Sequence, residues 1–583
     1  MIELVLLAAT LAAAPPAPSG TPRAPEPAHD VVQTYLDRYF EMYPSRATEA
    51  GLHDRDRELE EPSSERIAAW VAFNRETVER LREMLAPGQG TRDERMDREL
   101  LLRHAQRELF DYETIRAPAT DPLYWTGIAG NATVFLLVRD DLPKPERLAR
   151  AAARAALLPR LAGQAENALG ASPPSAIAPE IAKIAAGQAA ATATFYRKGF
   201  PQLAQGQKGE RAEALATSGA AAASALDHLS SFLGDLATKA TGSPRLGAER
   251  YSTLFRLYTG IDEPLGKVLE QAQADLVAKR REAAAYGRTV WGRYFPGEKP
   301  PADDRALLVR LFDRVAQDRA KSTDELVADF HDLVEKAFAF TREHHVVTLP
   351  DPVTLEAGRS PSYFVGQSVG GVYPAGPYAP DADTLFYLPT PPDSATPKEK
   401  DAFFRDFNHH FNVMITPHEI VPGHYVELKV AAHGAHKVRA LFGDGVYTEG
   451  WGTFCERLML DLGWGGPLDR LAHLKKQMEN IARTIVDIRV HTGEMSRDEV
   501  IHFVEGEALQ NQQFARNMWT RSITSAPQIT SYYLGYRQIW SLFQDVKKAR
   551  GESFHLQDFM DHMIDMGPVP VARYREALLG GTK

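Results

Sequence analysis

The chain has 583 residues, of which 44% are hydrophobic and 25% are charged. This composition is ordinary for a folded globular protein and excludes a fibrous repeat or a wholly disordered chain. The formal net charge is −10 and no concentrated Lys/Arg patch is present, so we expect no nucleic-acid partner. The length favours two or more packed lobes.

The chain begins with an 11-residue apolar run at 4–14, followed by the Pro-rich stretch PPAPSGTPRAPEPA. The run resembles the hydrophobic region of a secretory signal and is too short to span a bilayer, although Glu3 stands where a signal normally carries Lys or Arg. We therefore expect residues 1–28 to be a signal-like segment with a Pro-rich tail, and no membrane span. The expected location is periplasmic or secreted, with cytoplasmic as the alternative. The only cysteine, Cys455, excludes an intrachain disulfide, and no cysteine follows the run for lipid attachment.

The chain after this run has mainly the three- to four-residue apolar period of amphipathic helices. Long spans within 30–110 include DVVQTYLDRYFEMY and ERIAAWVAFNRETVERLREML. The Ala-rich stretch 144–240 predicts closely stacked antiparallel helices, because small side chains let helices approach each other. Further helices are predicted at 262–290 and 302–342. Together these segments predict a helical N-terminal lobe over residues 29–345.

The composition changes at 349–392, where proline and glycine are dense and the segments SYFV, VGGVY and TLFYL have β character. A small irregular sheet is predicted here. TLFYL could be an exposed edge that binds an extended peptide, or an ordinary covered strand, which we expect. Downstream, four phenylalanines are predicted to mark one helix face: Phe403, Phe404, Phe407 and Phe411. Residues 346–583 are predicted to form a second region with the small sheet and C-terminal helices, interleaved with the first lobe.

The segment TPHEIVPGHYVEL, residues 416–428, resembles the helical zinc motif HExxH with two extra residues between its histidines. Residues six apart on a regular helix differ by about 240° around the axis, so His418 and His424 would point in different directions. Pro422 cannot donate a hydrogen bond to the carbonyl of His418, and Gly423 tolerates unusual backbone angles. We therefore predict a bulged helix that returns His424 to the side of His418.

A purely structural interpretation of the same segment is also open. Thr416, Pro417 and Glu419 have the spacing of the N-cap, N1 and N3 positions of a new helix. In that case Glu419 would be a capping residue and the two histidines would be ordinary side chains.

A zinc site requires a further ligand, because a catalytic zinc has three protein ligands and leaves a fourth position to water. In VYTEGWGTFCERLML, residues 446–460, Glu449 lies 25 residues after His424 at the start of a predicted helix. Glu456 lies seven residues further on, which is two helical turns and therefore the same face. The combined order of these residues is typical of gluzincin peptidases.

Four blocks carry a wider resemblance: PHEIVPGHY, YTEGWGTFCERLMLDLG, VDIRVH and QITSYYLG. In order and spacing they resemble the bacterial family catalogued as domain of unknown function 885 (DUF885), of the gluzincin-like zinc metallopeptidases. The likeness extends from about residue 30 to the terminal FHLQDFMDHMIDMGPVPVARY. It implies a mainly α fold, a large helical two-lobed metallopeptidase with a central cleft and a small β-sheet. It also implies one Zn²⁺ per chain and a peptide substrate.

Carried over to the matching positions, the resemblance implies zinc ligands His418, His424 and Glu449, with Glu419 as general base. Two imidazoles and one carboxylate leave the ion with net positive charge, which lowers the pKa of a bound water to about 7 and polarises a carbonyl. A carboxylate beside the first ligand can take the proton during attack and hand it to the leaving amine.

The other blocks supply further candidates. Tyr532 and His491 would face the oxyanion, where each donor could contribute on the order of 3 kcal/mol of transition-state stabilisation. Gln528 and Arg537 are candidates for substrate binding, Arg537 as the partner of a substrate carboxylate.

Two acidic residues, Glu456 and Asp487, are candidates for orienting a liganding histidine from behind. The chain departs from the family pattern at residues 488–489 and 526–527, which hold Ile-Arg and Ala-Pro where the family usually has Thr-Gly and Pro-Gly. These departures concern the blocks that contain the predicted oxyanion residues and leave the metal motif intact.

We therefore expect a zinc-dependent peptidase that hydrolyses short or unfolded peptides with Glu419 as general base. Residues 346–583, with the small sheet and C-terminal helices, are then its zinc-binding catalytic region. The alternative is a catalytically silent zinc-containing protein that binds peptides. No G-x-S-x-G elbow or P-loop points to another enzyme class. The direction of cleavage, the residue specificity and the oligomeric state stay open at the level of sequence.

Overall fold

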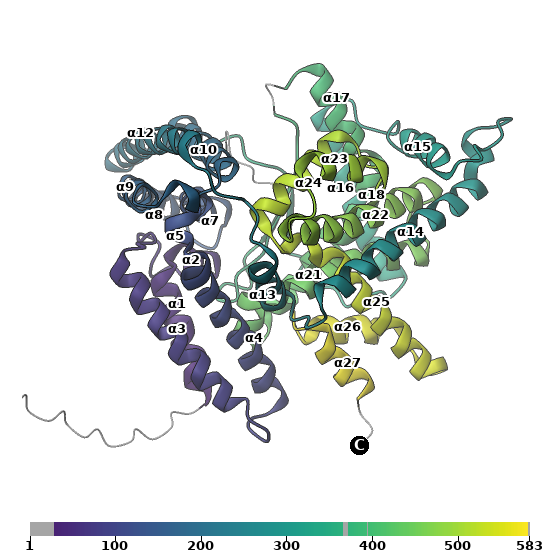
Figure 1. Ribbon diagram of the computed structural model, residues 1–583, viewed down its shortest axis with the longest axis horizontal. Helices are drawn as coiled ribbons and strands as arrows, with labels where there is room; N and C mark the ends of the chain where they lie inside the picture. The colour runs from purple at the N-terminus through teal and green to yellow at the C-terminus, as the bar shows by residue number, and fades with distance from the viewer. Residues whose placement is uncertain (1–27, 365–370, 393–394, 581–583) are drawn as a thin grey trace, which may run out of the picture.

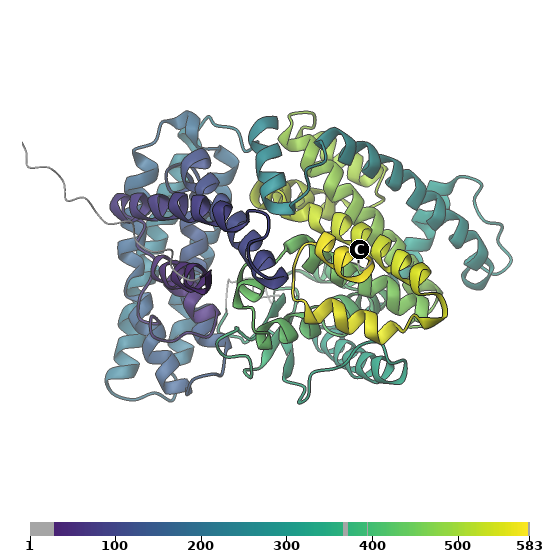
Figure 2. The ribbon, with the colours of Figure 1, turned by 90° about the horizontal axis from the view of Figure 1, so that it is seen from below.

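A computed structural model of the protein describes residues 28–364, 371–392 and 395–580. The fold is mainly α with one small sheet, as the sequence predicts. Two bodies lie side by side, one built from the purple and blue N-terminal helices and the other from the teal, green and yellow helices (Figures 1 and 2). Within the described ranges, no helix has the length and apolar character to cross a membrane. Residues 1–27, which hold most of the signal-like segment, lie outside these ranges.

The first body combines a helical layer of α1, α3 and α4 with a stack of Ala-rich helices. In the stack, α10 and α12 pack along each other through buried alanines, which explains why this stretch is rich in small residues. Its helices are α1 (Ala28–Met42), α2 (Pro44–Glu49), α3 (Ser64–Met84), α4 (Arg92–Leu109), α5 (Ala117–Thr120), α6 (Pro122–Asn131), α7 (Val134–Val138), α8 (Lys144–Ala155), α9 (Leu158–Gly170), α10 (Pro179–Thr194), α11 (Phe200–Ala204) and α12 (Glu210–Lys239).

The second body is organised around α22, which is buried along nearly its whole length. Helix α14 packs along α22, and α21 packs along α25. Its helices are α13 (Ala248–Thr259), α14 (Leu265–Tyr294), α15 (Asp304–Val315), α16 (Thr323–Glu343), α17 (Pro397–Asp406), α18 (His409–Glu419), α19 (His424–His433), α20 (Lys437–Phe442), α21 (Gly445–Leu462), α22 (Pro467–His491), α23 (Arg497–Gly506), α24 (Gln512–Ser525), α25 (Ser531–Arg550), α26 (Leu556–Asp565) and α27 (Val571–Leu579).

The sheet has three strands in the order β1 (Leu355–Arg359), β3 (Thr384–Leu388), β2 (Gly371–Tyr373), with β1 parallel and β2 antiparallel to β3. TLFYL is therefore the central strand, and the idea of an exposed edge is wrong. Its side chains alternate between two cores, because Leu385 and Tyr387 join one hydrophobic cluster while Phe386 and Leu388 join another. SYFV is not a strand over its described residues, and the sequence analysis missed β1, LEAGR.

The hydrophobic cores cross the predicted boundary near residue 345. One core joins α13, α14 and α15 with α22 and α25. Another joins α1, α3 and α4 with α16, α21 and the C-terminal helices. Segments from both predicted regions therefore share the same interior.

The predicted single helix face of four phenylalanines is wrong. Helix α17 ends at Asp406, and Asn408 caps α18 by accepting a hydrogen bond from the backbone N–H of Phe411. The rings still pack across this break, with Phe407 stacked on Phe403 at 4.4 Å between centroids. The break fixes the start of α18, the helix that ends at the zinc-like motif.

Candidate metal centre

The HEIVPGH segment breaks one helix and starts another. Helix α18 runs through Thr416 and Pro417, so the predicted capping box at Glu419 is wrong. Proline inside a helix leaves the carbonyl four residues earlier without its usual donor. Here that carbonyl belongs to Val413, and it accepts a hydrogen bond from Trp464 Nε1 at 2.8 Å. The indole therefore replaces the backbone donor and allows α18 to continue to Glu419.

The connection between the two helices brings His424 back toward His418. The predicted bulge within one helix is instead a break, because α18 ends at Glu419 and α19 begins at His424. Gly423 is needed there, since a Cβ on it would lie 1.9 Å from the carbonyl oxygen of His418. The two imidazole rings meet nearly edge to face, with centroids 4.7 Å apart. The local break thus supplies the change of direction that the six-residue spacing requires.

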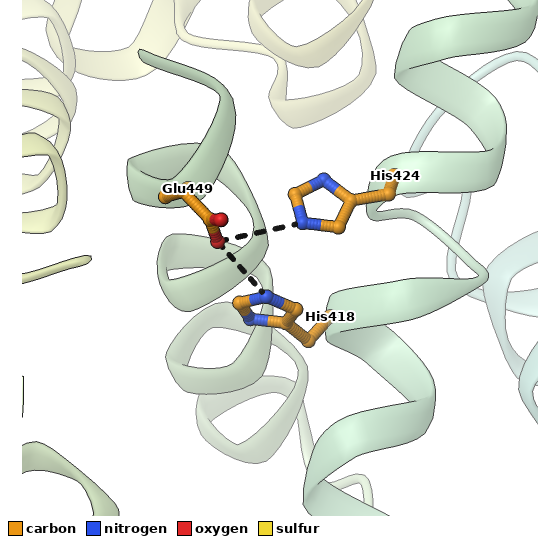
Figure 3. A group of neighbouring side chains, drawn as sticks. All are labelled: His418, His424 and Glu449. Carbon is orange, nitrogen blue, oxygen red and sulfur yellow. Dashed lines mark ion pairs between the residues drawn. The ribbon is translucent and has the colours of Figure 1, made fainter. Parts of the chain in front are cut away.

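His418, His424 and Glu449 converge from three helices (Figure 3). Glu449 Oε2 lies 3.7 Å from His418 Nε2 and 3.8 Å from His424 Nε2. The three potential ligand atoms all lie within 4.8 Å of one another. Both histidines are buried, at 3% and 8% exposure. This is the spacing of donors that could share one ion.

Helix α21 presents a single face to His418. Glu449 and Glu456 lie two turns apart, and both carboxylates approach the His418 ring. Gly452 lies between them, and a Cβ on it would come within 2.7 Å of the imidazole. The missing side chain at Gly452 therefore makes room for the histidine between the two carboxylates.

The Nδ1 atom of each histidine faces a fully buried carboxylate, which can accept the ring N–H. His418 Nδ1 lies 2.8 Å from Glu456 Oε1, and His424 Nδ1 lies 3.3 Å from Glu427 Oε2. His473 contacts the other oxygen of Glu456 at 3.2 Å. With Nδ1 as the donor, Nε2 of each ring faces Glu449 and is the atom that would bind a metal. The sequence analysis missed Glu427, whose only signal is its position three residues after His424.

The electrostatics of the centre favour a cation. Burial lowers the pKa of His418, but the carboxylates of Glu449 and Glu456 outweigh burial and raise it to about 9. Burial raises the pKa of Glu456, but the imidazoles of His418 and His473 outweigh it and lower the pKa to about 2. Together with Glu419 and Glu427, four carboxylates surround two imidazoles. A buried excess of negative charge is costly unless a cation compensates it, and two imidazoles with a carboxylate suit zinc.

Glu419 has the position that a general base requires. It is the last residue of α18, directly after His418, and it is partly buried. Its carboxylate forms no hydrogen bond or ion pair with any residue that the structure describes. Its charge nevertheless acts on both imidazoles and helps raise their pKa values. Glu449 and Glu456 contact the histidines directly, whereas the Glu419 carboxylate has no such partner among the described residues.

Gln528, three residues before α25, and Tyr532, in the first turn of α25, approach the triad formed by His418, His424 and Glu449. Gln528 Nε2 donates to Glu449 Oε1 at 2.9 Å and lies 3.4 Å from the hydroxyl of Tyr532. The Tyr532 ring stacks near His418, at 6.3 Å between centroids. Gln528, predicted to bind substrate, is therefore a partner of the Glu449 carboxylate. Tyr532 therefore lies beside the triad, and its hydroxyl is a candidate hydrogen-bond donor to a substrate bound there.

His491 and Asp487 form a separate polar group. His491 Nδ1 accepts from the backbone N–H of Leu246 at 3.2 Å, and Nε2 donates to the carbonyl of Ser522 at 3.0 Å. Neither ring nitrogen is left to face an oxyanion. Asp487 accepts from Tyr251 and Ser522 at 2.7 and 2.9 Å, and it contacts neither triad histidine. The carboxylates that orient His418 and His424 are Glu456 and Glu427.

Arg537 lies away from the triad. It is exposed and lines a cavity of about 400 Å³ together with Glu263, Asp444 and Arg575. It lies five positions after Tyr532 on α25, which corresponds to about 140° around the helix. The two side chains therefore leave the helix on different sides.

Two cavities lie between the N-terminal helices and the second body. The smaller, about 370 Å³, is lined by Arg103, Tyr258 and Gly445, and Gly445 lies one turn before Glu449. The larger, about 650 Å³, is lined by Tyr112, His491 and Ala526, and Ala526 lies two residues before Gln528. Three residues line both cavities: Tyr39, Arg46 and Arg107. Residues close to Glu449 and Gln528 in the chain therefore line the two cavities, and His418, His424 and Glu449 themselves line neither.

Comparison with known proteins identifies a family and a fold. The model of the family described as "Bacterial protein of unknown function (DUF885)" matches residues 44–578. A solved structure from Shewanella oneidensis, provisionally described as a lipoprotein of unknown function, has a TM-score of 0.77 and 23% identity and covers 95% of this chain and 100% of its own. A second, from Colwellia psychrerythraea and provisionally described as a lipoprotein, has a TM-score of 0.75 and 15% identity and covers 94% and 98%. No curated protein matches the chain.

Proposed function

The chain belongs to the DUF885 family of bacterial proteins of unknown function, and from that membership and its metal-like centre we propose that it is a zinc-dependent peptidase. The observation that carries the proposal is the convergence of His418, His424 and Glu449, with their donor atoms within 4.8 Å of one another. The uncommitted carboxylate of Glu419 beside them adds the group that peptide hydrolysis needs. The resemblance of the sequence blocks to gluzincin peptidases supports the same reaction class.

His418, His424 and Glu449 would hold the ion. A zinc ion in such a site supplies a positive charge that acidifies a water molecule and polarises the substrate carbonyl. Glu427 and Glu456 fix the orientation of the two imidazoles through their Nδ1 atoms, and Gln528 fixes the carboxylate of Glu449. The protein thereby holds the three ligands in place before substrate arrives.

Glu419 is the proposed general base. Its carboxylate accepts the proton of the attacking water and donates it to the amine that leaves when the peptide bond breaks. Glu419 has no hydrogen-bond partner among the described residues, which supports this role, because a carboxylate tied to a neighbouring donor would transfer protons less readily. Tyr532 is the proposed hydrogen-bond donor to the oxygen of the tetrahedral intermediate.

We propose that the peptide lies in the two cavities between the bodies. Their volumes, about 370 and 650 Å³, suit a few amino-acid residues and exclude a folded domain. Short or unfolded peptides are therefore the proposed substrates. The apolar run at residues 4–14 and the description of two similar structures as lipoproteins support a periplasmic or secreted location.

The proposal can be tested on the purified protein. Its zinc content is measured, and a mixed peptide library is incubated with it and analysed by mass spectrometry. We expect one zinc per chain, cleaved peptides, loss of cleavage after chelation and recovery on adding zinc. Bound zinc with peptide binding but no cleavage would support the catalytically silent alternative instead.

A further inference from the structure

We infer that Arg521, beside Arg483, forms a subsite for a carboxylate of the peptide substrate. This inference rests on the proposed peptidase function and adds a substrate class to it. The carboxylate could be the C-terminus of the peptide or an acidic side chain. Arg521 lies near the C-terminal end of α24 and is partly buried.

Arg521 is connected to the triad by two hydrogen bonds. Its Nη2 donates to Gln528 Oε1 at 2.7 Å, and Gln528 Nε2 donates to Glu449 Oε1 at 2.9 Å. One amide side chain therefore separates the guanidinium from the carboxylate of Glu449. A peptide spans roughly 3.5 Å per residue, so a substrate carboxylate on Arg521 would lie within about three residues of the bond to be cleaved.

Within the described ranges, Arg521 has only distant carboxylates around it, of which Glu449 and Glu479 act on its guanidinium. Among the residues that the structure describes, no carboxylate lies within 4.0 Å of its guanidinium. Nearby, Lys476 and Arg483 both pair with Glu479, so one carboxylate serves two cations. Among the described residues, Arg521 thus has no carboxylate in direct contact, and Arg483 shares Glu479 with Lys476. A partly buried guanidinium without a direct ion-pair partner can bind an anionic ligand.

The two arginines are held over one ring. The guanidinium carbon of Arg483 lies 4.6 Å from the centroid of Tyr532, and that of Arg521 lies 5.8 Å from it. Such contacts orient the planar guanidinium groups. Tyr532 is also the residue proposed to face the oxyanion, so Arg483 and Arg521 lie beside the proposed site of reaction.

A further donor lies beside Arg483. Asn480 is fully buried, and its Oδ1 accepts from Arg483 Nη1 at 3.2 Å. Its Nδ2 has no hydrogen-bond partner within the described part of the chain. A buried amide donor without a partner is uncommon, because desolvation without a hydrogen bond is costly. It is consistent with an acceptor being supplied from outside the chain.

The chemistry of the cluster favours a carboxylate over other ligands. A guanidinium presents paired N–H donors in a plane that matches the two oxygens of a carboxylate. Peptides carry carboxylates at the C-terminus and on Asp and Glu. The sequence suggested Arg537 for this role, but Arg537 lines a cavity that contains no triad residue. Arg521 is connected to the triad through Gln528.

The test compares matched peptides with wild-type protein and two variants. One peptide pair has a free or an amidated C-terminus, and a second pair has Glu or Gln near the cleaved bond. Arg521→Gln removes the charge. Arg516→Gln is the control, because Arg516 lies on the same helix and is exposed. Zinc content is measured for each protein, and hydrolysis is measured as kcat/KM.

We expect the wild type and Arg516→Gln to prefer one carboxylate peptide over its uncharged partner by roughly 10- to 100-fold. Arg521→Gln should lose that preference, so that kcat/KM falls more for the carboxylate peptides than for their uncharged partners. The affected pair identifies the carboxylate as terminal or as a side chain. No preference in the wild type, or an equal fall for charged and uncharged peptides in Arg521→Gln, would overturn the inference.

Equilibrium binding of the same peptides to zinc-loaded Glu419→Gln protein, with and without Arg521→Gln, separates this inference from the proposed function. If the carboxylate peptides bind more tightly and Arg521→Gln abolishes this preference, but the wild type hydrolyses no peptide, the subsite is supported and the peptidase function is contradicted. If the wild type hydrolyses peptides but shows no preference for the carboxylate peptides, the peptidase function is supported and the subsite is contradicted.

Discussion

Gly450 of α21 and Gly535 of α25 bring their two helices into backbone contact. A Cβ on Gly450 would lie 2.4 Å from the carbonyl carbon of Gly535, and a Cβ on Gly535 would lie 1.9 Å from the carbonyl oxygen of Val446. Helix α21 carries Glu449, and Gln528 lies in the short turn of residues 528–530 that leads into α25. The close approach of the helices is what places the amide of Gln528 2.9 Å from Glu449.

Gly535→Ala should destabilise the protein by about 2 kcal/mol or more, because the added methyl group overlaps a backbone atom that cannot move independently. Denaturant unfolding measures the effect. Gly292→Ala is the matched control, since Gly292 is an exposed helical glycine with open space around its Cβ. The control should be neutral or stabilised by roughly 0.5–1 kcal/mol. Equal stability of Gly535→Ala and the wild type would rule out the tight helix contact.

Glu427→Gln and Glu456→Gln should each weaken zinc binding by roughly 10- to 100-fold, because a neutral amide no longer fixes the adjacent imidazole or raises its basicity. Competition with a chromophoric chelator measures the affinity. Glu343→Gln, an exposed residue at the end of α16, serves as control and should leave the affinity unchanged. If both buried variants bind zinc like the wild type, the two carboxylates do not support the ligands.

His491 should make folding stability depend on pH. Burial lowers its pKa to about 4, although the hydrogen bond to Ser522 opposes this shift. The unfolded chain takes up a proton near pH 6.5, and the folded protein does so only near pH 4. The contribution of His491 is therefore present above pH 6.5 and is lost as the pH falls toward 4, by on the order of 3 kcal/mol. Asp487, 3.9 Å away, has its pKa raised to about 7 by burial and stays mostly protonated over this window.

The difference in unfolding free energy between wild type and His491→Gln isolates this effect, since other titrating groups cancel. We expect the difference to shrink from pH 7 to pH 4. A difference that is constant over this range would contradict the buried neutral imidazole. NMR titration of the imidazole in the wild type provides a check that does not depend on how well the variant folds.

The sequence predicts best those features that depend on residues close together in the chain. Apolar periodicity predicts the helices, and the seven-residue separation of Glu449 and Glu456 predicts a shared face of α21. The motif at residues 416–424 indicates that its helix cannot stay regular. Each of these inferences depends on residues within a few turns of one another.

The remaining features depend on contacts between distant parts of the chain. Pro417 lies inside α18 because Trp464, 47 positions later, supplies a donor to Val413. The strand LEAGR has weak β propensity and forms by pairing in parallel with TLFYL. Arg521 reaches Glu449 only through Gln528. No local pattern in the sequence encodes these relationships.

The central claim is that Glu419 serves as the base of a zinc-dependent peptidase, and the most direct measurement compares peptide hydrolysis and zinc content of wild type and Glu419→Gln. The variant changes one oxygen to an amide nitrogen on a side chain with no partner among the described residues, so it should fold and keep one zinc per chain. We predict that hydrolysis falls by about 100-fold or more while zinc content is unchanged. Undiminished hydrolysis by the zinc-loaded variant would contradict the account.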